Sequence, residues 1–220
     1  MSVNVMSKPA NETNITVAGA GPIGALLAII LARKGYNINL FESRPDSRQH
    51  DIYQGKSINI ALSDRGWLAL EAVGIAEQVR KEALPMKKRV MHGVDGTITE
   101  QAYGKDDQAI WSVSRAGINE QLLNLAEKEV NVALHFEKRL THVDFTSGCA
   151  SFSFDVAQSK GHIEIDADYI FGADGAFSKV RRLAQETPRF SYSQSFMPQS
   201  YIELTIPANE NETGDARFKM

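Results

Sequence analysis

The chain has 220 residues, of which 43% are hydrophobic and 23% are charged, and its formal net charge is −3 at pH 7. This composition is typical of a globular protein with one large or two small domains. A net negative charge gives no support for a nucleic-acid-binding protein, which needs a basic face. A single cysteine, Cys149, excludes an internal disulfide and a thiolate-clustered metal site, and the five histidines show no ligand spacing.

The first residues, 1–14, are polar and do not resemble a secretory signal. The longest apolar run, 25–32, is too short to span a bilayer. Together with the single cysteine, these features predict a cytoplasmic protein with no membrane segment in this chain.

A glycine-rich turn follows the first predicted strand. Residues 14–18 (NITVA) are rich in β-branched side chains, and Gly19-x-Gly21-x-x-Gly24 comes directly after them. A helix is predicted over 22–34 and a second strand over 37–42. This strand–turn–helix–strand unit is the context in which a Gly-x-Gly-x-x-Gly motif binds the pyrophosphate of a dinucleotide.

The acidic residue Glu42 ends the second predicted strand, 18 residues after Gly24. A carboxylate at this place accepts hydrogen bonds from a ribose 2′-hydroxyl and repels a 2′-phosphate. The bound nucleotide is therefore expected to be FAD or NAD rather than NADP, and the motif does not separate the first two. A glycine-rich turn without a ligand is the alternative.

Further elements are predicted along the rest of the chain. A strand at 57–62 precedes a broken helix that begins after Ser63 and ends at Pro85. A hairpin turns at Asp95-Gly96, and a helix begins near Ser114. The remaining segments are expected to be strands 132–145 and 149–156 paired with each other, a strand, turn and helix start over 162–182, and β structure over 190–208. The apolar side of the broken helix is assigned to Leu68, Val73, Ile75 and Val79.

A second motif distinguishes an FAD-binding protein from an NAD-dependent dehydrogenase. The strand-like segment DYIFGADGAFSKVRR, 168–182, delivers Gly172-x-Asp174-Gly175 into a turn, and Ser178 and Arg181 follow. A simple NAD dehydrogenase has no role for such a turn. Taken alone, the segment could also be an ordinary strand–turn–helix with a surface aspartate.

The glycine turn, Glu42 and GADGAFSKVR together resemble the single-component FAD-dependent aromatic hydroxylases. The segments SINIALSDRG, SVSRAGIN and YSQSFMPQSYIELTIP match one subgroup of these enzymes more closely, and the similarity extends from about Val17 to Pro207. The resemblance implies an α/β fold. A Rossmann-like FAD-binding domain would comprise 14–84 and 106–185, and part of a β-rich substrate-binding domain would comprise 85–105 and 186–220.

The resemblance also implies roles for individual residues. Glu42 and Arg44 would hold the adenosine half of FAD, and Ala61 would lie beside the cofactor. Arg115 would contact the pyrophosphate, where a guanidinium suits phosphate oxygens. The expected cofactor-binding set is completed by Asp174 and Gly175, with Gly19, Gly21 and Gly24, and Arg181 would hold the Asp-Gly loop or meet the nicotinamide cofactor.

The substrate would be anchored by Arg89 and Tyr103. In the subgroup, an arginine after the PM dipeptide and a tyrosine in YG bind the carboxylate of an amino acid whose ring carries an aromatic amine. The two residues lie at the outer ends of the predicted hairpin, so strand pairing would let them share one anion. Without the resemblance, Arg89 beside Lys87 and Lys88 would be read as part of a solvated basic face.

The implied reaction is the insertion of one oxygen atom of O2 into the ring, through a flavin C4a-hydroperoxide formed after NADPH reduces bound FAD. The sequence reveals no general base. Members of the family are considerably longer than this chain, so we expect it to lack a C-terminal part and not to complete turnover alone. Two alternatives stay open: an NAD-dependent Rossmann dehydrogenase, and a flavin-binding fragment that is inactive by itself.

Overall fold

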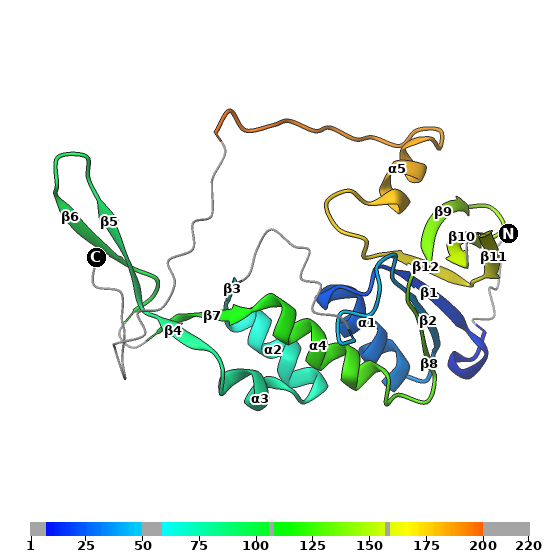
Figure 1. Ribbon diagram of the computed structural model, residues 1–220, viewed down its shortest axis with the longest axis horizontal. Helices are drawn as coiled ribbons and strands as arrows, with labels where there is room; N and C mark the ends of the chain where they lie inside the picture. The colour runs from blue at the N-terminus through cyan, green and yellow to red at the C-terminus, as the bar shows by residue number, and fades with distance from the viewer. Residues whose placement is uncertain (1–7, 50–58, 106–107, 157–158, 200–220) are drawn as a thin grey trace, which may run out of the picture.

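A computed structural model describes residues 8–49, 59–105, 108–156 and 159–199. Its centre is a parallel sheet in the order β12-β1-β2-β8 (Figure 1). The strands of this sheet are β1 (Asn14–Ala18), β2 (Asn37–Phe41), β8 (Val132–His135) and β12 (Tyr169–Gly172). Because β1 lies between β2 and β12, the glycine turn that follows β1 lies beside the Asp-Gly turn that follows β12.

Helix α1 packs on one side of this sheet, α2 and α4 pack against α1, and α3 packs against α2. Their apolar side chains join those of the strands in the main core. Helix α1 begins with Pro22 directly after Gly21, a position where the missing N–H of proline costs nothing, and Gly35 with φ +92° follows its end. Helix α4 lies beside α1 (Figure 1). The helices are α1 (Pro22–Arg33), α2 (Asp64–Val73), α3 (Ala76–Arg80) and α4 (Arg115–Ala126), and a short 3-10 turn, η1 (Ala10–Glu12), precedes β1.

An antiparallel sheet in the order β11-β10-β9 covers the other side, together with α5 (Lys179–Gln185). Ile38 and Leu40 of β2 belong to the main core, whereas Phe41 points to the opposite face, as the alternation of a strand requires. There its ring stacks on Phe152 with 3.7 Å between centroids. The strands of this sheet are β9 (Arg139–Asp144), β10 (Cys149–Val156) and β11 (Ser159–Asp166).

A third sheet, in the order β3-β7-β4, leads to a two-stranded hairpin that projects from the body of the molecule (Figure 1). Both strands of the hairpin are exposed along their whole length, and it turns through Asp95 and Gly96, as predicted. These strands are β3 (Asn59–Leu62), β4 (Leu84–Met86), β7 (Ile110–Ser114) and, in the hairpin, β5 (Lys88–His92) and β6 (Ile98–Ala102).

The structure confirms the α/β fold class, the first βαβ unit and the helix that begins after Ser114, whose hydroxyl accepts a hydrogen bond from the Gly117 amide. The expectation for 132–145 is wrong. That stretch forms two strands, because β8 joins the parallel sheet beside β2 and only β9 pairs with β10. Residues 190–199 form neither helix nor strand, so the β structure expected there is also wrong. Residues 200–208 and the start of the strand expected at 57–62 lie outside the described residues.

Within the described residues, no helix combines the length and apolar character that crossing a membrane requires. The same part of the chain contains no group of three or more histidine, cysteine, aspartate or glutamate side chains that could hold a metal ion.

Helix α2 turns a different face to the core than the sequence pattern suggests. Leu68 is 64% exposed, whereas Leu70 is 4% exposed and packs with Trp67 and Val73. Gly74, in the left-handed conformation, ends α2, and α3 begins as a separate helix at Ala76, so one helical pattern across both elements misassigns Leu68.

The two leucines provide a matched test of this packing. We expect Leu70→Ala to lower the free energy of unfolding by about 2–5 kcal/mol, because it leaves a cavity in the core. Leu68→Ala should change it by less than about 0.5 kcal/mol. Denaturant unfolding monitored by circular dichroism measures both, and equal losses would contradict the packing of α2.

Candidate functional site

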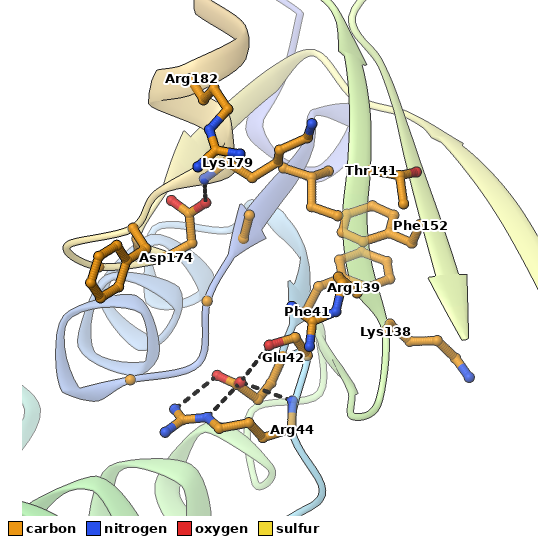
Figure 2. Close-up of a pocket in the computed structure, with 18 of the residues that line it drawn as sticks. Phe41, Glu42, Arg44, Lys138, Arg139, Thr141, Phe152, Asp174, Lys179 and Arg182 are labelled. Carbon is orange, nitrogen blue, oxygen red and sulfur yellow. Dashed lines mark hydrogen bonds and ion pairs between the residues drawn. The ribbon is translucent and has the colours of Figure 1, made fainter. Parts of the chain in front are cut away.

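A cavity of about 670 Å³ lies at the carboxyl ends of the parallel strands, between that sheet and the antiparallel one (Figure 2). Ala18 at the end of β1 and Phe41 at the end of β2 line it, as do residues of the turn after β12. Ligands of open α/β sheets bind at this edge, where strand ends and helix N-termini meet. The first N–H groups of α1 lie next to the cavity, because Gly21, immediately before the helix, lines it.

The glycine turn is packed against the turn after β12. Gly19 has φ +103°, and a Cβ atom there would lie 2.5 Å from the Ala173 carbonyl oxygen. A Cβ on Gly24 would lie 1.9 Å from the carbonyl oxygen of Gly19. A Cβ on Gly21 would meet no atom within 4 Å. Two of the three glycines therefore permit backbone packing, whereas Gly21 leaves its backbone open to the cavity.

Glu42 lies directly after β2 and is buried. One carboxylate oxygen, Oε2, accepts a hydrogen bond from the Ala20 amide at 3.1 Å, and the other accepts one from the Arg44 amide at 3.0 Å. Burial alone would raise the pKa of Glu42, but the hydrogen bonds and charge of Arg44, with the Ala20 amide, hold that pKa below its usual value. The carboxylate is therefore ionised at neutral pH.

Arg44 folds back onto this carboxylate, with 2.9 Å between its Nε and Oε1 (Figure 2). Oε2 carries fewer hydrogen bonds than Oε1, so it is the atom with acceptor capacity left for a ligand hydroxyl.

Asp174 occupies the turn after β12, on the opposite wall of the cavity (Figure 2). Its Oδ2 accepts hydrogen bonds from the amides of Lys179 at 2.6 Å and Val180 at 3.2 Å, at the start of α5. Its Oδ1 is buried and has no hydrogen-bond partner among the described residues. Arg181 holds the same turn by donating to the carbonyl oxygen of Ala176. The turn is thus fixed by its own hydrogen bonds, while one buried acceptor remains for a ligand donor.

The cavity is strongly cationic. Its lining contains only two carboxylates, Glu42 and Asp174, and one of these is paired with Arg44. The cationic residues of the lining are Arg44, Arg115, Lys138, Arg139, Lys179 and Arg182. Apart from Arg44, none of them forms an ion pair with a described residue. Such an excess of positive charge suits a ligand that carries phosphate groups.

The structure brings most of the expected cofactor residues together. Those that line the cavity are Gly19, Gly21, Glu42, Arg44, Arg115, Asp174 and Gly175. Gly24 contacts the turn from behind. Ala61 lies on β3, paired with Ser112 of β7, and does not line the cavity.

The two expected substrate residues, Arg89 and Tyr103, lie on the hairpin and outside the cavity. Arg89 pairs with Gln101, and its Nε donates to the Gln101 side chain at 2.9 Å. The Tyr103 amide donates to the carbonyl oxygen of Lys87. This register places Arg89 and Tyr103 at diagonal positions on one face of the hairpin. The hairpin projects from the body of the molecule, far from the parallel sheet whose strand ends line the cavity (Figure 1).

Several residues of the site were missed from the sequence: Phe41, Lys138, Arg139, Leu140, Thr141, Phe152, Lys179 and Arg182. Lys138 and Arg139 had a usable signal, because they follow a short apolar run that could have been read as a parallel strand. Reading 132–145 as one strand placed them in the middle of an antiparallel pair. Phe152 carried no signal, since its place depends on how the two sheets pack.

A comparison with protein families matches residues 12–212 to the FAD-binding domain family. The chain belongs to this FAD-binding domain family.

Curated proteins similar to this chain include three that are named kynurenine 3-monooxygenase. The one from Christiangramia forsetii is 40% identical over 91% of this chain and 44% of its own length. The one from Caenorhabditis elegans is 38% identical over 90% of this chain and 46% of its own length. The one from Sus scrofa is 37% identical over 94% of this chain and 43% of its own length. The chain thus spans less than half the length of these relatives.

Solved structures similar to this FAD-binding domain show the same fold at low sequence identity. The flavin-dependent monooxygenase PieE, in complex with FAD and substrate, aligns with a TM-score of 0.65 over 79% of this chain and 32% of its own, at 18% identity. The 2-methyl-3-hydroxypyridine-5-carboxylic acid oxygenase aligns with a TM-score of 0.62 over 78% of this chain and 42% of its own, at 21% identity.

The residues present fit the ADP half of FAD. Gly21 leaves the open space that a pyrophosphate needs, and the same cavity is lined by cations that form no ion pair with a described residue. The buried Oδ1 of Asp174 has no donor among the described residues. The acceptor capacity of Glu42 matches a ribose hydroxyl.

Gly21→Ala tests the open space beside the glycine turn. Gly21 has φ −68° and ψ 178°, which alanine adopts without strain, so the variant should keep the thermal unfolding midpoint. Its affinity for FAD, measured by flavin fluorescence titration, should fall at least about tenfold, or roughly 1.4 kcal/mol. Gly24→Ala should instead lower the unfolding midpoint, and an unchanged FAD affinity in Gly21→Ala would contradict this geometry.

Glu42→Gln tests the ionised carboxylate through pH. The folded-state pKa of Glu42 is depressed, so its stabilisation is present above the ordinary value of 4.5 and is lost as pH falls through the lower folded value. We expect the free energy of unfolding of the unsubstituted chain to exceed that of Glu42→Gln at pH 7. The difference should shrink as pH falls below about 4.5. A difference that grows toward low pH would contradict the assignment.

Proposed function

We propose that this chain binds the ADP half of FAD in the cavity at the strand ends. The backbone at Gly21 and the first N–H groups of α1 meet the pyrophosphate, and Arg115 supplies a guanidinium to the same oxygens. Glu42 accepts a hydrogen bond from the ribose 2′-hydroxyl, and Asp174 accepts one through Oδ1 from a hydroxyl of the ribityl chain next to the pyrophosphate. The observation that carries the proposal is the convergence of the glycine turn, Glu42 and the Asp174 turn on one cationic cavity.

We propose further that the whole protein is a monooxygenase that converts L-kynurenine to 3-hydroxy-L-kynurenine with O2, using NADPH as reductant. The support is the name shared by relatives that are 37–40% identical to this chain. When bound, FAD supplies the redox and oxygen-activating chemistry, which no side chain can provide. The residues of this chain bind and orient the cofactor, and the hairpin contributes an anchor for the substrate.

The anchor proposed for L-kynurenine is the pair Arg89 and Tyr103. A carboxylate that leaves water needs a charged partner, and a phenol adds a second, directional hydrogen bond. The shared face of the two residues on the hairpin supports this role. Because the hairpin lies away from the cavity, the proposal assigns it to the amino acid end of the substrate and not to the cofactor.

Two measurements test the proposal in order. Purified chain should bind FAD with a stoichiometry of one and show flavin absorbance bands. A hybrid protein, in which this chain replaces the matching part of the Christiangramia forsetii relative, should consume NADPH faster with L-kynurenine and form the hydroxylated product. A chain that binds NAD and no flavin would favour a dehydrogenase, and a hybrid that binds FAD but ignores L-kynurenine would refute the substrate.

Arg89→Ala in the hybrid should weaken L-kynurenine binding by about 2–4 kcal/mol, the usual cost of removing one partner of a desolvated charge pair. Lys88→Ala is the matched control, because Lys88 points to the other face of the hairpin and pairs with Glu100 at 2.6 Å. The KM for L-kynurenine in stimulated NADPH oxidation measures both. Equal KM values in the two variants would remove Arg89 from the substrate site.

A further inference from the structure

The segment after β2, residues 42–48, extends beyond the three residues that line the cavity, Glu42, Ser43 and Arg44. Glu42 and Arg44 are followed by Asp46 and Arg48, which do not line the cavity and are almost completely buried. The side chain of Arg48 is 11% exposed, unusual for an arginine outside a binding site. Its burial calls for a physical role.

Arg48 closes the segment onto itself through Asp46. Its Nε lies 2.9 Å from Asp46 Oδ1, its Nη2 lies 2.6 Å from Oδ2, and its own amide donates to Oδ1 at 3.0 Å. This two-pronged pairing fixes the direction of the guanidinium as well as its charge. Residues 46–48 therefore form a rigid loop, and the Arg48 guanidinium points toward a neighbouring helix.

The neighbouring helix is α4, and Arg48 contacts its last turn. Arg48 Nη1 donates to the Asn124 side chain at 3.0 Å and to Glu127 Oε2 at 2.9 Å. The guanidinium also lies 5.7 Å from the ring centroid of Phe136, beyond the end of β8. One side chain thus joins the segment after β2 to α4 and to the β8–β9 connection.

The same three elements carry the nucleotide contacts. Helix α4 begins with Arg115, which lines the cavity, and ends at the turn held by Arg48. The β8–β9 connection is also fastened to the segment, because the amides of Lys138 and Glu137 donate to the carbonyl oxygens of Glu42 and Arg44. A displacement of the segment would move Glu42 relative to Arg115.

We propose that Arg48 is a positioning residue for the nucleotide site: it sets where Glu42 and Arg44 stand relative to Arg115 without touching the ligand itself. The inference rests on the proposed binding of FAD. Buried ion pairs contribute little net stability compared with apolar packing but restrict geometry. Without Arg48, the segment after β2 loses its hydrogen bonds to Asn124 and Glu127 at the end of α4.

The test uses Arg48→Met, which keeps much of the side-chain volume, with FAD and 5′-AMP as ligands. Both affinities should fall by the same factor, at least about tenfold, because the displaced groups meet the adenosine half that the two ligands share. Arg48→Lys keeps the charge beside Asp46 but cannot span Asp46, Asn124 and Glu127 together, so it should show a smaller loss. Titrations at a temperature where circular dichroism shows full folding measure all values.

Arg33→Met is the matched control. Arg33 pairs with Glu129 at 2.7 Å and donates to the Val73 carbonyl oxygen, and none of its hydrogen bonds or ion pairs with described residues reaches the segment 42–48. It should lower the thermal unfolding midpoint and leave both ligand affinities within twofold of the unsubstituted chain.

A double-mutant cycle separates positioning from simple loss of stability. If Arg48 acts through Glu42, Arg48→Met should reduce FAD affinity far less in a Glu42→Gln background than alone. Additive losses would overturn the inference, as would a folded Arg48→Met with unchanged FAD affinity. If Arg48→Met does not fold, an unchanged affinity in Arg48→Lys would overturn it equally. An unsubstituted chain that binds no FAD would refute the proposed function itself.

Discussion

The site depends on one buried carboxylate. Glu42 stands where β2 ends, and the cost of removing its charge from water is met by two backbone amides and the guanidinium of Arg44. Because one of those amides belongs to Ala20 in the glycine turn, the carboxylate also ties β2 to the loop that would receive the pyrophosphate. Charge, loop position and ligand selectivity are therefore set by the same group of hydrogen bonds.

The cavity is built from turns that hold each other. Gly19 and the Ala173 carbonyl approach so closely that no Cβ fits between them, which brings the turn after β1 and the turn after β12 to one edge of the sheet. Phe41 and Phe152 stack behind that edge and join the parallel sheet to the antiparallel one. The stacked phenylalanine rings thus hold the polar residues of the cavity in fixed positions. Groups that are pre-organised in this way need little reordering when a ligand binds.

Much of this arrangement could be predicted from local sequence. The glycine spacing, Glu42 and the Asp174-Gly175 turn follow from short-range rules, because each depends on backbone conformation near its own strand. The cations Lys138 and Arg139 were missed, since their place depends on β8 joining β2 across almost a hundred residues of chain. The hydrogen bonds that Arg48 donates to Asn124 and Glu127 could not be foreseen either, because both partners come from the end of a helix that is distant in the sequence. Leu68 shows the same limit within a single helix, where the break at Gly74 changes which face is buried.

The central claim is that an ionised carboxylate in a cationic cavity selects a free ribose 2′-hydroxyl. The most direct measurement is competition for the FAD site between 5′-AMP and adenosine 2′,5′-bisphosphate at low ionic strength. Repulsion by Glu42 should make the bisphosphate the weaker competitor by at least about tenfold, despite its additional negative charge. Equal or tighter binding of the bisphosphate would show that the cations dominate the site, and the account of Glu42 would be contradicted.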